Sequence, residues 1–203
     1  MAELAVSTTI GQLKVLFNKI KHVYFFTEAG KLPGQLTTAN FELPIVEDTV
    51  QFNTGEPDVS RVKLTTGDTW TSIATAGDAE ITLQLSTVAS SLLDIFFEKT
   101  GKNEGETPDT VSLGATIGGR SFAGYGYSFS SPKKVNGGLL MTSADNEVVL
   151  YLPDVEMYSS LQTDNDVPAF INVTCTPTVD KNGVQIWVLP KVEGETPTPG
   201  EKP

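Results

Sequence analysis

From position 41 almost to its C-terminal end, the chain alternates between short apolar segments and turn-forming residues. The clearest segment, residues 80–85, alternates strictly, with Glu80, Thr82 and Gln84 on one side and Ile81, Leu83 and Leu85 on the other. Successive strand side chains point to opposite faces of a sheet, so the pattern predicts a strand with one buried and one polar face. The 18 glycines and 12 prolines supply turns for many short strands. The sequence therefore predicts a mainly β fold.

Comparable apolar or alternating segments are expected to form the other strands. These are residues 22–26, 41–46, 49–52, 59–64, 111–117, 120–128, 138–142, 148–152, 169–176 and 184–189. Asp180-Lys181-Asn182-Gly183 stands before the last of them, and Asn-Gly is the strongest short-range signal for a tight hairpin. We therefore expect the last two strands to form a β-hairpin.

One segment, residues 86–100, predicts an amphipathic helix that flanks the sheet. Ser86 or Thr87 can cap its start, and Gly101 is well placed just beyond its end. Its apolar side chains cover an arc of roughly 200°, about twice the stripe that a helix on a single core needs. Either the helix covers its own sheet on one side and meets a neighbouring subunit on the other, or it is deeply buried in one domain. The first interpretation assigns to a subunit interface Val88, Leu92, Leu93, Phe96 and Phe97.

Apolar residues at helical spacing also predict a short N-terminal helix over residues 9–21, followed by the strand at 22–26. Residues 191–203 are rich in Pro, Gly, Glu and Thr, a composition typical of flexible tails. No composition shift marks a boundary inside the β region. We expect an N-terminal arm with its helix packed on the domain (residues 1–40), one β domain (41–190) and a flexible tail (191–203).

Charge and composition exclude several classes of protein. The 14 basic and 25 acidic residues give a formal net charge of −11, which argues against a groove that grips phosphates. The acidity still allows a surface along which DNA passes without binding. One histidine and one cysteine exclude an intramolecular disulfide and metal sites built from several imidazoles or thiolates. No stretch approaches the about 20 apolar residues of a membrane helix, and no signal peptide is recognised, so we expect a soluble, cytoplasmically made product.

The search for catalytic chemistry finds no complete motif. Gly-rich segments lack the nucleotide-binding patterns, and His22 has no accompanying nucleophile elbow. Cys175 lies in an alternating segment and is expected to be a buried apolar residue. Asp164-Asn165-Asp166 lacks the glycine and distal glutamate of a calcium loop, and Asp154 with Glu156 is an expected coincidence among many acids. We expect no enzyme activity, no cofactor and no metal.

The order of β segments, one helix and a terminal hairpin resembles a bacteriophage major tail tube protein, a family related to the type VI secretion tube protein. The resemblance lies in three stretches: Gly-Glu-Pro-Asp-Val-Ser-Arg-Val-Lys-Leu (55–64), Ala-Glu-Ile-Thr-Leu-Gln-Leu-Ser-Thr-Val-Ala-Ser-Ser-Leu-Leu-Asp-Ile-Phe-Phe (79–97) and Phe-Ile-Asn-Val-Thr-Cys-Thr-Pro-Thr-Val-Asp-Lys-Asn-Gly-Val (170–184). The resemblance covers residues 40–190 and concerns the order of the elements and the general pattern of apolar and polar residues. The helix predicted before residue 40 departs from the plain β arm expected in that family.

The resemblance implies a β-sandwich or barrel with one flanking helix, six copies of which close into a ring. Stacked rings would form the tail tube of a virion, with DNA passing through the channel without specific binding and other tail proteins as further partners. Ring closure and stacking require one closing and one propagating contact, and joining sheet edges between copies removes exposed edges. Glu80, Thr82 and Gln84 are candidates for a polar face, on the lumen or the exterior. The expected location is the virion tail, after synthesis in the host bacterial cytoplasm.

Two alternatives stay open. The chain is also compatible with another virion β protein, such as a tail terminator, a head decoration or an adhesion module. A carbohydrate-binding β-sandwich is the third interpretation, and it would need aromatic side chains exposed on a flat face. The candidates for that role are Trp70, Tyr125, Tyr127 and Trp187.

Overall fold

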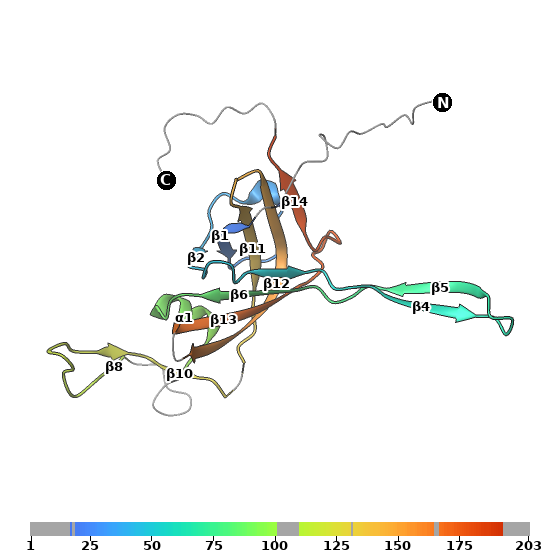
Figure 1. The fold of residues 1–203 in the computed structure, drawn as a ribbon. Helices are drawn as coiled ribbons and strands as arrows, with labels where there is room; N and C mark the ends of the chain where they lie inside the picture. The colour runs from blue at the N-terminus through green and yellow to red at the C-terminus, as the bar shows by residue number, and fades with distance from the viewer. Residues whose placement is uncertain (1–16, 18, 101–109, 131, 165–166, 193–203) are drawn as a thin grey trace.

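The computed structural model describes residues 17, 19–100, 110–130, 132–164 and 167–192 of the 203-residue chain. The fold is mainly β with one α-helix among these residues, as the sequence predicts (Figure 1). Its elements in chain order are β1 (Ile20–Phe26), the 3₁₀ helix η2 (Pro33–Gln35), β2 (Phe41–Leu43), β3 (Gln51–Asn53), β4 (Asp58–Lys63), β5 (Thr69–Thr75), β6 (Glu80–Leu85), α1 (Ser90–Phe96), β7 (Glu98–Thr100), β8 (Val111–Ser112), β9 (Ala123–Gly124), β10 (Gly126–Ser128), β11 (Val135–Ser143), β12 (Val148–Asp164), β13 (Val167–Pro177) and β14 (Trp187–Pro190).

One antiparallel sheet forms the body of the molecule. Its strands follow the order β2-β1-β11-β12-β13-β6-β3, and β14 pairs with β12 outside this path. Three further pairs stand apart from this sheet: β4 with β5, β7 with β10, and β8 with β9. Since β1 is an internal strand between β2 and β11, the β domain begins by Ile20 and not at residue 41 as the sequence indicated.

The long strand β12 organises the sheet. One of its edges pairs with β11, from Val149 to Met157, while the other pairs first with β14 and then with β13. Between Leu152 and Val155, β12 has one more residue than the facing segment of β11, which is a β-bulge. Pro153 lies in this bulge, where a missing N–H costs no ladder hydrogen bond. The bulge therefore lets a proline-containing segment continue as one strand.

The apolar faces of the strands enclose one core. In Figure 1, β11 and the first half of β12 run in a clearly different direction from β6 and β13, so the sheet bends over its own apolar face. The side chains inside form a single cluster that includes Val23, Phe25, Ile81, Leu83, Leu139, Met141, Leu152, Met157, Ile171 and Val173. The removal of these apolar side chains from water is the main favourable contribution to folding.

The predicted helix is real but shorter than the sequence indicated. It spans Ser90–Phe96 and not residues 86–100, and its N-cap is Ala89, whose side chain cannot cap. Thr87, one of the predicted caps, lies two positions before the N-cap and accepts a hydrogen bond from the Ala89 N–H at 3.1 Å. Phe97 is extended, and Glu98–Thr100 pair with β10 as strand β7. Strand pairing therefore ends the helix where periodicity alone continues it.

Two other predictions are corrected near the chain ends. Ile20 and Lys21 belong to β1, so the predicted helix over residues 9–21 does not include them, and residues 9–16 lie outside the described part. The turn at Asp180–Gly183 exists, with Gly183 donating to the Asp180 carbonyl at 3.0 Å. However, β14 pairs with β12 and not with β13, so the predicted hairpin is wrong. The predicted flexible tail falls almost entirely on residues outside the described part, 193–203.

Gly137, in β11, supplies the first testable prediction. A Cβ atom there would lie 2.4 Å from both Phe25 Cε2 and the Phe26 carbonyl oxygen. We expect Gly137→Ala to lower the free energy of unfolding by about 1–3 kcal/mol, because the core of β1 must shift. Urea denaturation followed by circular dichroism measures this change. Gly34→Ala is the control, since its Cβ would meet nothing within 4 Å and stability should be unchanged.

Candidate functional site

The alternation predicted for residues 80–85 is confirmed in β6. Ile81, Leu83 and Leu85 are fully buried. On the opposite face Glu80 is exposed, and Thr82 and Gln84 are half-buried. The cross-strand register extends this arrangement over the neighbouring strands, because directly paired residues share a face. We call the resulting surface the polar face; it contains Gln51, Asn53, Glu80, Thr82, Gln84, Asn136, Glu156, Tyr158, Ser160, Gln162, Asn172, Thr174 and Thr176, together with one apolar residue, Phe170.

The polar face is rich in amides and hydroxyls and poor in positive charge. Its charged members are Glu80 and Glu156, and Lys134 at its border forms an ion pair with Glu156. The hydrogen bond from Lys134 to that carboxylate raises the pKa of the lysine. The residues of this surface include no cluster of unpaired Lys or Arg for phosphates.

A long hairpin, β4–β5, projects from the body (Figure 1). We call residues 56–78 the first arm; all are exposed except Gly77, which is half-buried. At the base of this hairpin its two backbone segments approach closely. A Cβ on Gly77 would lie 2.5 Å from the Glu56 carbonyl oxygen, and a Cβ on Gly55 would lie 2.6 Å from the Asp78 carbonyl oxygen. Glycines are therefore required at this crossing, which sets the direction in which the first arm leaves the body.

A second hairpin, residues 111–124, projects on another side of the body; we call it the second arm (Figure 1). Gly118 and Gly119 at its tip both have positive φ, 57° and 74°, as a two-residue type I′ turn requires. The Leu113 N–H donates to the Phe122 carbonyl, so these residues face each other across the hairpin, and Val111 lies on the same side. All three are about half exposed, at 50%, 49% and 51%.

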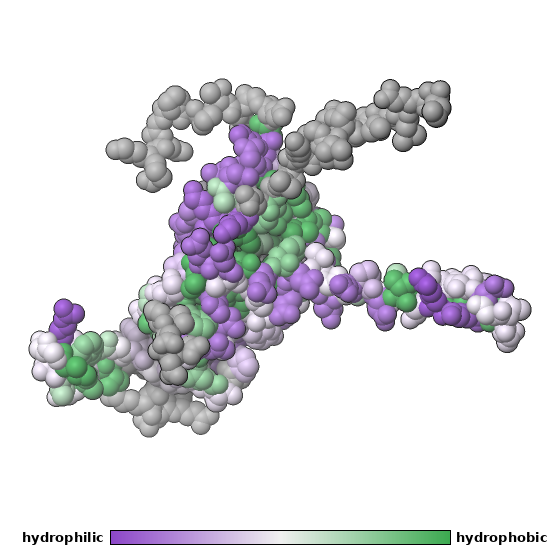
Figure 2. All heavy atoms as spheres, viewed as in Figure 1, coloured by the Kyte–Doolittle hydropathy of each residue, from purple (hydrophilic) through white to green (hydrophobic). Residues whose placement is uncertain are grey.

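Both arms expose apolar side chains that the described part of the chain leaves in contact with solvent. The first arm carries Trp70 (73% exposed), Ile73 and Val59, and the second carries Ile117 beside the apolar residues already named. Figure 2 shows both arms standing clear of the body, with hydrophobic residues among hydrophilic ones. Because a two-stranded hairpin is at best marginally stable in water, contacts outside the single chain would stabilise each arm.

The residues predicted for a subunit interface on the helix are divided by the structure. Leu92, Phe96 and Phe97 are buried in the core of their own chain, at 4%, 1% and 5% exposure, so they are not on the surface that a neighbour meets. This corrects the prediction for these three, because the short helix lies on the sheet with its wide apolar arc inward. Leu93 is half-buried and packs against the core, and Val88, before the helix, is 48% exposed.

A polar cluster fixes the segment before β11 against α1. Asp94 forms an ion pair with Lys99 at 2.7 Å and accepts a hydrogen bond from the Tyr127 hydroxyl at 2.6 Å. Hydrogen bonds from Lys99 and Tyr127 lower the pKa of Asp94. Burial, with the Asp94 hydrogen bond second, raises the pKa of Tyr127 to about 12. Lys133 completes the cluster by donating to the Asp94 carbonyl at 2.8 Å.

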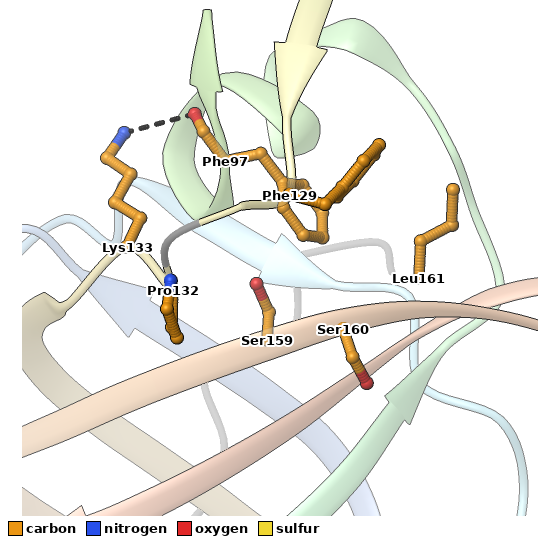
Figure 3. A pocket seen from close by; sticks show the side chains of 7 residues that line it. All are labelled: Phe97, Phe129, Pro132, Lys133, Ser159, Ser160 and Leu161. Atoms are coloured by element: carbon orange, nitrogen blue, oxygen red, sulfur yellow. Dashed lines mark hydrogen bonds between the residues drawn. The ribbon is translucent and has the colours of Figure 1, made fainter.

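A pocket of about 380 Å³ opens beside this cluster. Figure 3 shows the rings of Phe97 and Phe129 together on one side of it, with Ser159 on β12 pointing toward them and Leu161 farther along the strand. The two rings meet edge to face, with centroids 5.1 Å apart. The pocket is lined by Phe97, Phe129, Pro132, Lys133, Ser159, Ser160 and Leu161.

The pocket borders an open edge of the sheet. Beyond Met157, where pairing with β11 ends, residues Tyr158 to Gln162 pair with β13 on one side. Among the described residues, no strand pairs with the other side of this segment. An unpaired strand edge is a template for the addition of another strand. The open edge of β12 and the pocket were not predicted from the sequence, because both depend on where β11 ends.

The aromatic residues considered for carbohydrate binding do not share one surface. Trp70 lies on the first arm and Trp187 on β14. Tyr125 and Tyr127 belong to the segment around β10, where the Lys99 ammonium lies 3.8 Å from the centre of the Tyr125 ring. The structure therefore does not assemble the four into the flat aromatic platform that this interpretation needs.

The remaining candidates have structural environments. His22 contacts the Glu42 carboxylate at 2.6 Å on the neighbouring strand. Cys175 is fully buried as expected, and burial raises the pKa of its thiol to about 12. Asp154 is half-buried at the β12 bulge, and Glu156 is on the polar face, where it pairs with Lys134. Within the described ranges no group of three metal-ligating side chains comes together, and no helix there has the length and apolarity to cross a membrane.

No protein-family model matches the chain, and no curated protein matches it. The function must therefore be inferred from the polar face, the two arms and the open edge with its pocket.

Replacing Asp94 with Asn removes the carboxylate that Lys99 and Tyr127 share. We expect the pKa of Tyr127 to fall from about 12 but to stay above the ordinary value of about 10, because burial persists. In the wild type, the Asp94 carboxylate contributes to folding stability. This contribution is complete above about pH 4 and is lost as the pH falls through the lowered pKa of Asp94. Tyrosine NMR titration measures the first effect, with Asp145→Asn as control. An unchanged Tyr127 pKa would contradict the contact.

Proposed function

We propose that the protein is a structural component of a bacteriophage tail, where identical copies form hexameric rings that stack into a tail tube for genome delivery. The observation that carries the proposal is the pair of arms, which extend from the body and expose apolar side chains on both of their strands. The resemblance of residues 40–190 to tail tube proteins supports the same assignment.

The arms support self-assembly on energetic grounds. Full burial of an exposed Val, Leu or Ile contributes about 1.5–3 kcal/mol, so an arm side chain that is already half covered gains about half of this in an interface. If these side chains remained in water, the two hairpins, which have marginal stability as isolated two-stranded elements, would have no stabilising contacts. A neighbouring molecule that covers them turns each arm into part of an interface.

The geometry supports a contact that repeats. The arms leave the body on different sides, so the surfaces they reach in a neighbour differ from the surfaces around their own base (Figure 1). Such head-to-tail contacts close into rings when the rotation permits and otherwise propagate. Two arms on different sides provide for two kinds of contact, one within a ring and one between rings.

The polar face supports passage of DNA without binding. The residues of the polar face supply no cluster of unpaired Lys or Arg to neutralise phosphates, and the net charge of −11 adds a repulsive background. On this proposal the polar face, including Glu80, Thr82 and Gln84, lines the channel. The tube lies in the virion tail and contacts other tail proteins, and the chain needs neither a membrane nor a catalytic centre.

Electron microscopy with a charge variant of the second arm tests assembly. Leu113→Glu places a carboxylate on the apolar face of the second arm, where it contacts no core residue. We expect a folded chain by circular dichroism whose rings or tubes form only at roughly 4- to 13-fold higher concentration, the equivalent of about 0.8–1.5 kcal/mol of lost burial, because Leu113 is already half covered in the single chain. Val179→Glu, at a turn position 58% exposed outside both arms, is the matched control and should assemble normally. Wild-type protein that stays monomeric at millimolar concentration would contradict the proposal.

Positive charge introduced on the polar face tests the channel. We expect Thr82→Lys combined with Thr174→Lys, which are directly paired across β6 and β13, to make assembled particles retain DNA at low salt and release it as salt rises. The matched variant with Glu at both positions should retain none, like the wild type. Filter retention of labelled DNA over a salt series measures the effect. Equal DNA retention by the Lys and Glu variants would remove the polar face from the channel.

A further inference from the structure

We infer that Trp70 on the first arm of one copy docks into the pocket beside the open edge of β12 in a second copy. The inference rests on the proposed function, because it names the residues of one contact between identical chains.

The pocket is suited to an apolar side chain. Its volume of about 380 Å³ lies at the lower end of the range for small ligands. The polar groups at its wall are already engaged: the Ser159 hydroxyl donates to the Phe96 carbonyl at 3.1 Å, and the Lys133 ammonium donates to the carbonyls of Asp94 and Phe97. Phe129, 60% exposed, and Leu161, 39% exposed, leave apolar surface at the mouth. A polar ligand would find few free partners, whereas an aromatic ring would bury apolar surface against Phe97, Phe129 and Leu161.

Trp70 is the side chain on the arms that most needs a pocket. It is 73% exposed, more than any other large apolar residue of either arm. The register of the first arm passes from Val62 opposite Thr71 to Lys63 opposite Thr69, so Trp70 is the extra residue of a β-bulge. Bulges re-aim a side chain away from the regular ladder. A bulged tryptophan in water is a feature that burial in a partner would explain.

The open edge explains why a hairpin, and not a small molecule, is the occupant. Backbone groups of Tyr158 to Gln162 on that side lack a strand partner among the described residues, and a strand from another chain supplies the missing donors and acceptors. Within the part of the chain that the structure describes, β4 and β5 pair with each other alone, so each has an unpaired outer edge. One docking event would satisfy both edges and fill the pocket next to them.

Size and placement favour a second copy over the same chain. The first arm contributes 23 residues, from 56 to 78, which matches the about 20–30 residues per side of a standard stable interface. In Figure 1 this arm leaves the body on the side opposite to α1 and β10, where the pocket lies, so it points away from its own pocket. The contact is therefore head-to-tail between copies.

Disulfide trapping between two variants tests the inference. Trp70→Cys and Leu161→Cys chains are mixed at assembling concentration and oxidised mildly, while the buried Cys175 gives no background because its thiol is inaccessible. We expect a covalent dimer that contains one chain of each variant. Ile117→Cys, on the tip of the second arm, replaces Trp70→Cys in the control mixture and should give no dimer with Leu161→Cys.

Fluorescence supplies a measurement that keeps the tryptophan. In a Trp187→Phe background Trp70 is the single tryptophan, and its emission should shift to shorter wavelength as the concentration rises into the assembling range. Leu161→Glu should abolish the shift, whereas Val188→Glu, 59% exposed on β14, should keep it.

The outcomes separate this inference from the proposed function. Rings or tubes that form without the Trp70–Leu161 cross-link and without the emission shift would overturn the inference and leave the tail tube proposal standing. A cross-link from Ile117→Cys would also overturn it, in favour of the second arm as occupant. A chain that neither assembles nor cross-links overturns both.

Discussion

The fold depends on the backbone pairing of one strand, β12. Its two edges are used by three different strands: β11 on one side, and β14 followed by β13 on the other. The bulge at Pro153 lets the strand change direction without losing its ladder, so the two parts of the sheet enclose a common core. The same strand is unpaired on one side beyond Met157, and the pocket opens there. The stable core and the incomplete edge are therefore two consequences of one strand being longer than its neighbour β11.

The arms obey a different physical rule from the core. Their shapes are set by local backbone requirements: a glycine turn at Gly118–Gly119 and a close glycine crossing at Gly55 and Gly77. Neither arm gains its shape from burial, since residues 56–76 and 110–126 are all exposed. The local sequence therefore fixes the shape of each arm while its side chains remain exposed to solvent. Each arm is thus preorganised for contact with a partner. Such preorganisation reduces the entropy that binding must overcome.

The sequence predicts elements well where local pattern and tertiary context agree. The strand at residues 80–85 was predicted with its correct ends and faces, because it lies between two strands and buries one side. β12 was predicted to end at Leu152, since a proline normally stops a central strand, and the β-bulge within β12 makes Pro153 acceptable. The Asn182–Gly183 turn forms as predicted, but the strand that follows it, β14, pairs with β12. It pairs with residues 148–151, which precede the bulge and are not paired with β13. The failures share a cause, which is pairing between residues far apart in sequence.

The candidate site shows the same division. Glu80, Thr82 and Gln84 could be placed on one polar side from alternation alone, whereas their continuation across β13 and β12 depends on register that no local pattern encodes. Register also links the polar face to the open edge, because Tyr158, Ser160 and Gln162 belong to both. A strand added at this edge by another copy would extend the sheet, and its alternate side chains would continue the same face. A contact between copies and a continuous polar surface are thus not separate requirements on this chain: the geometry of β12 connects the two.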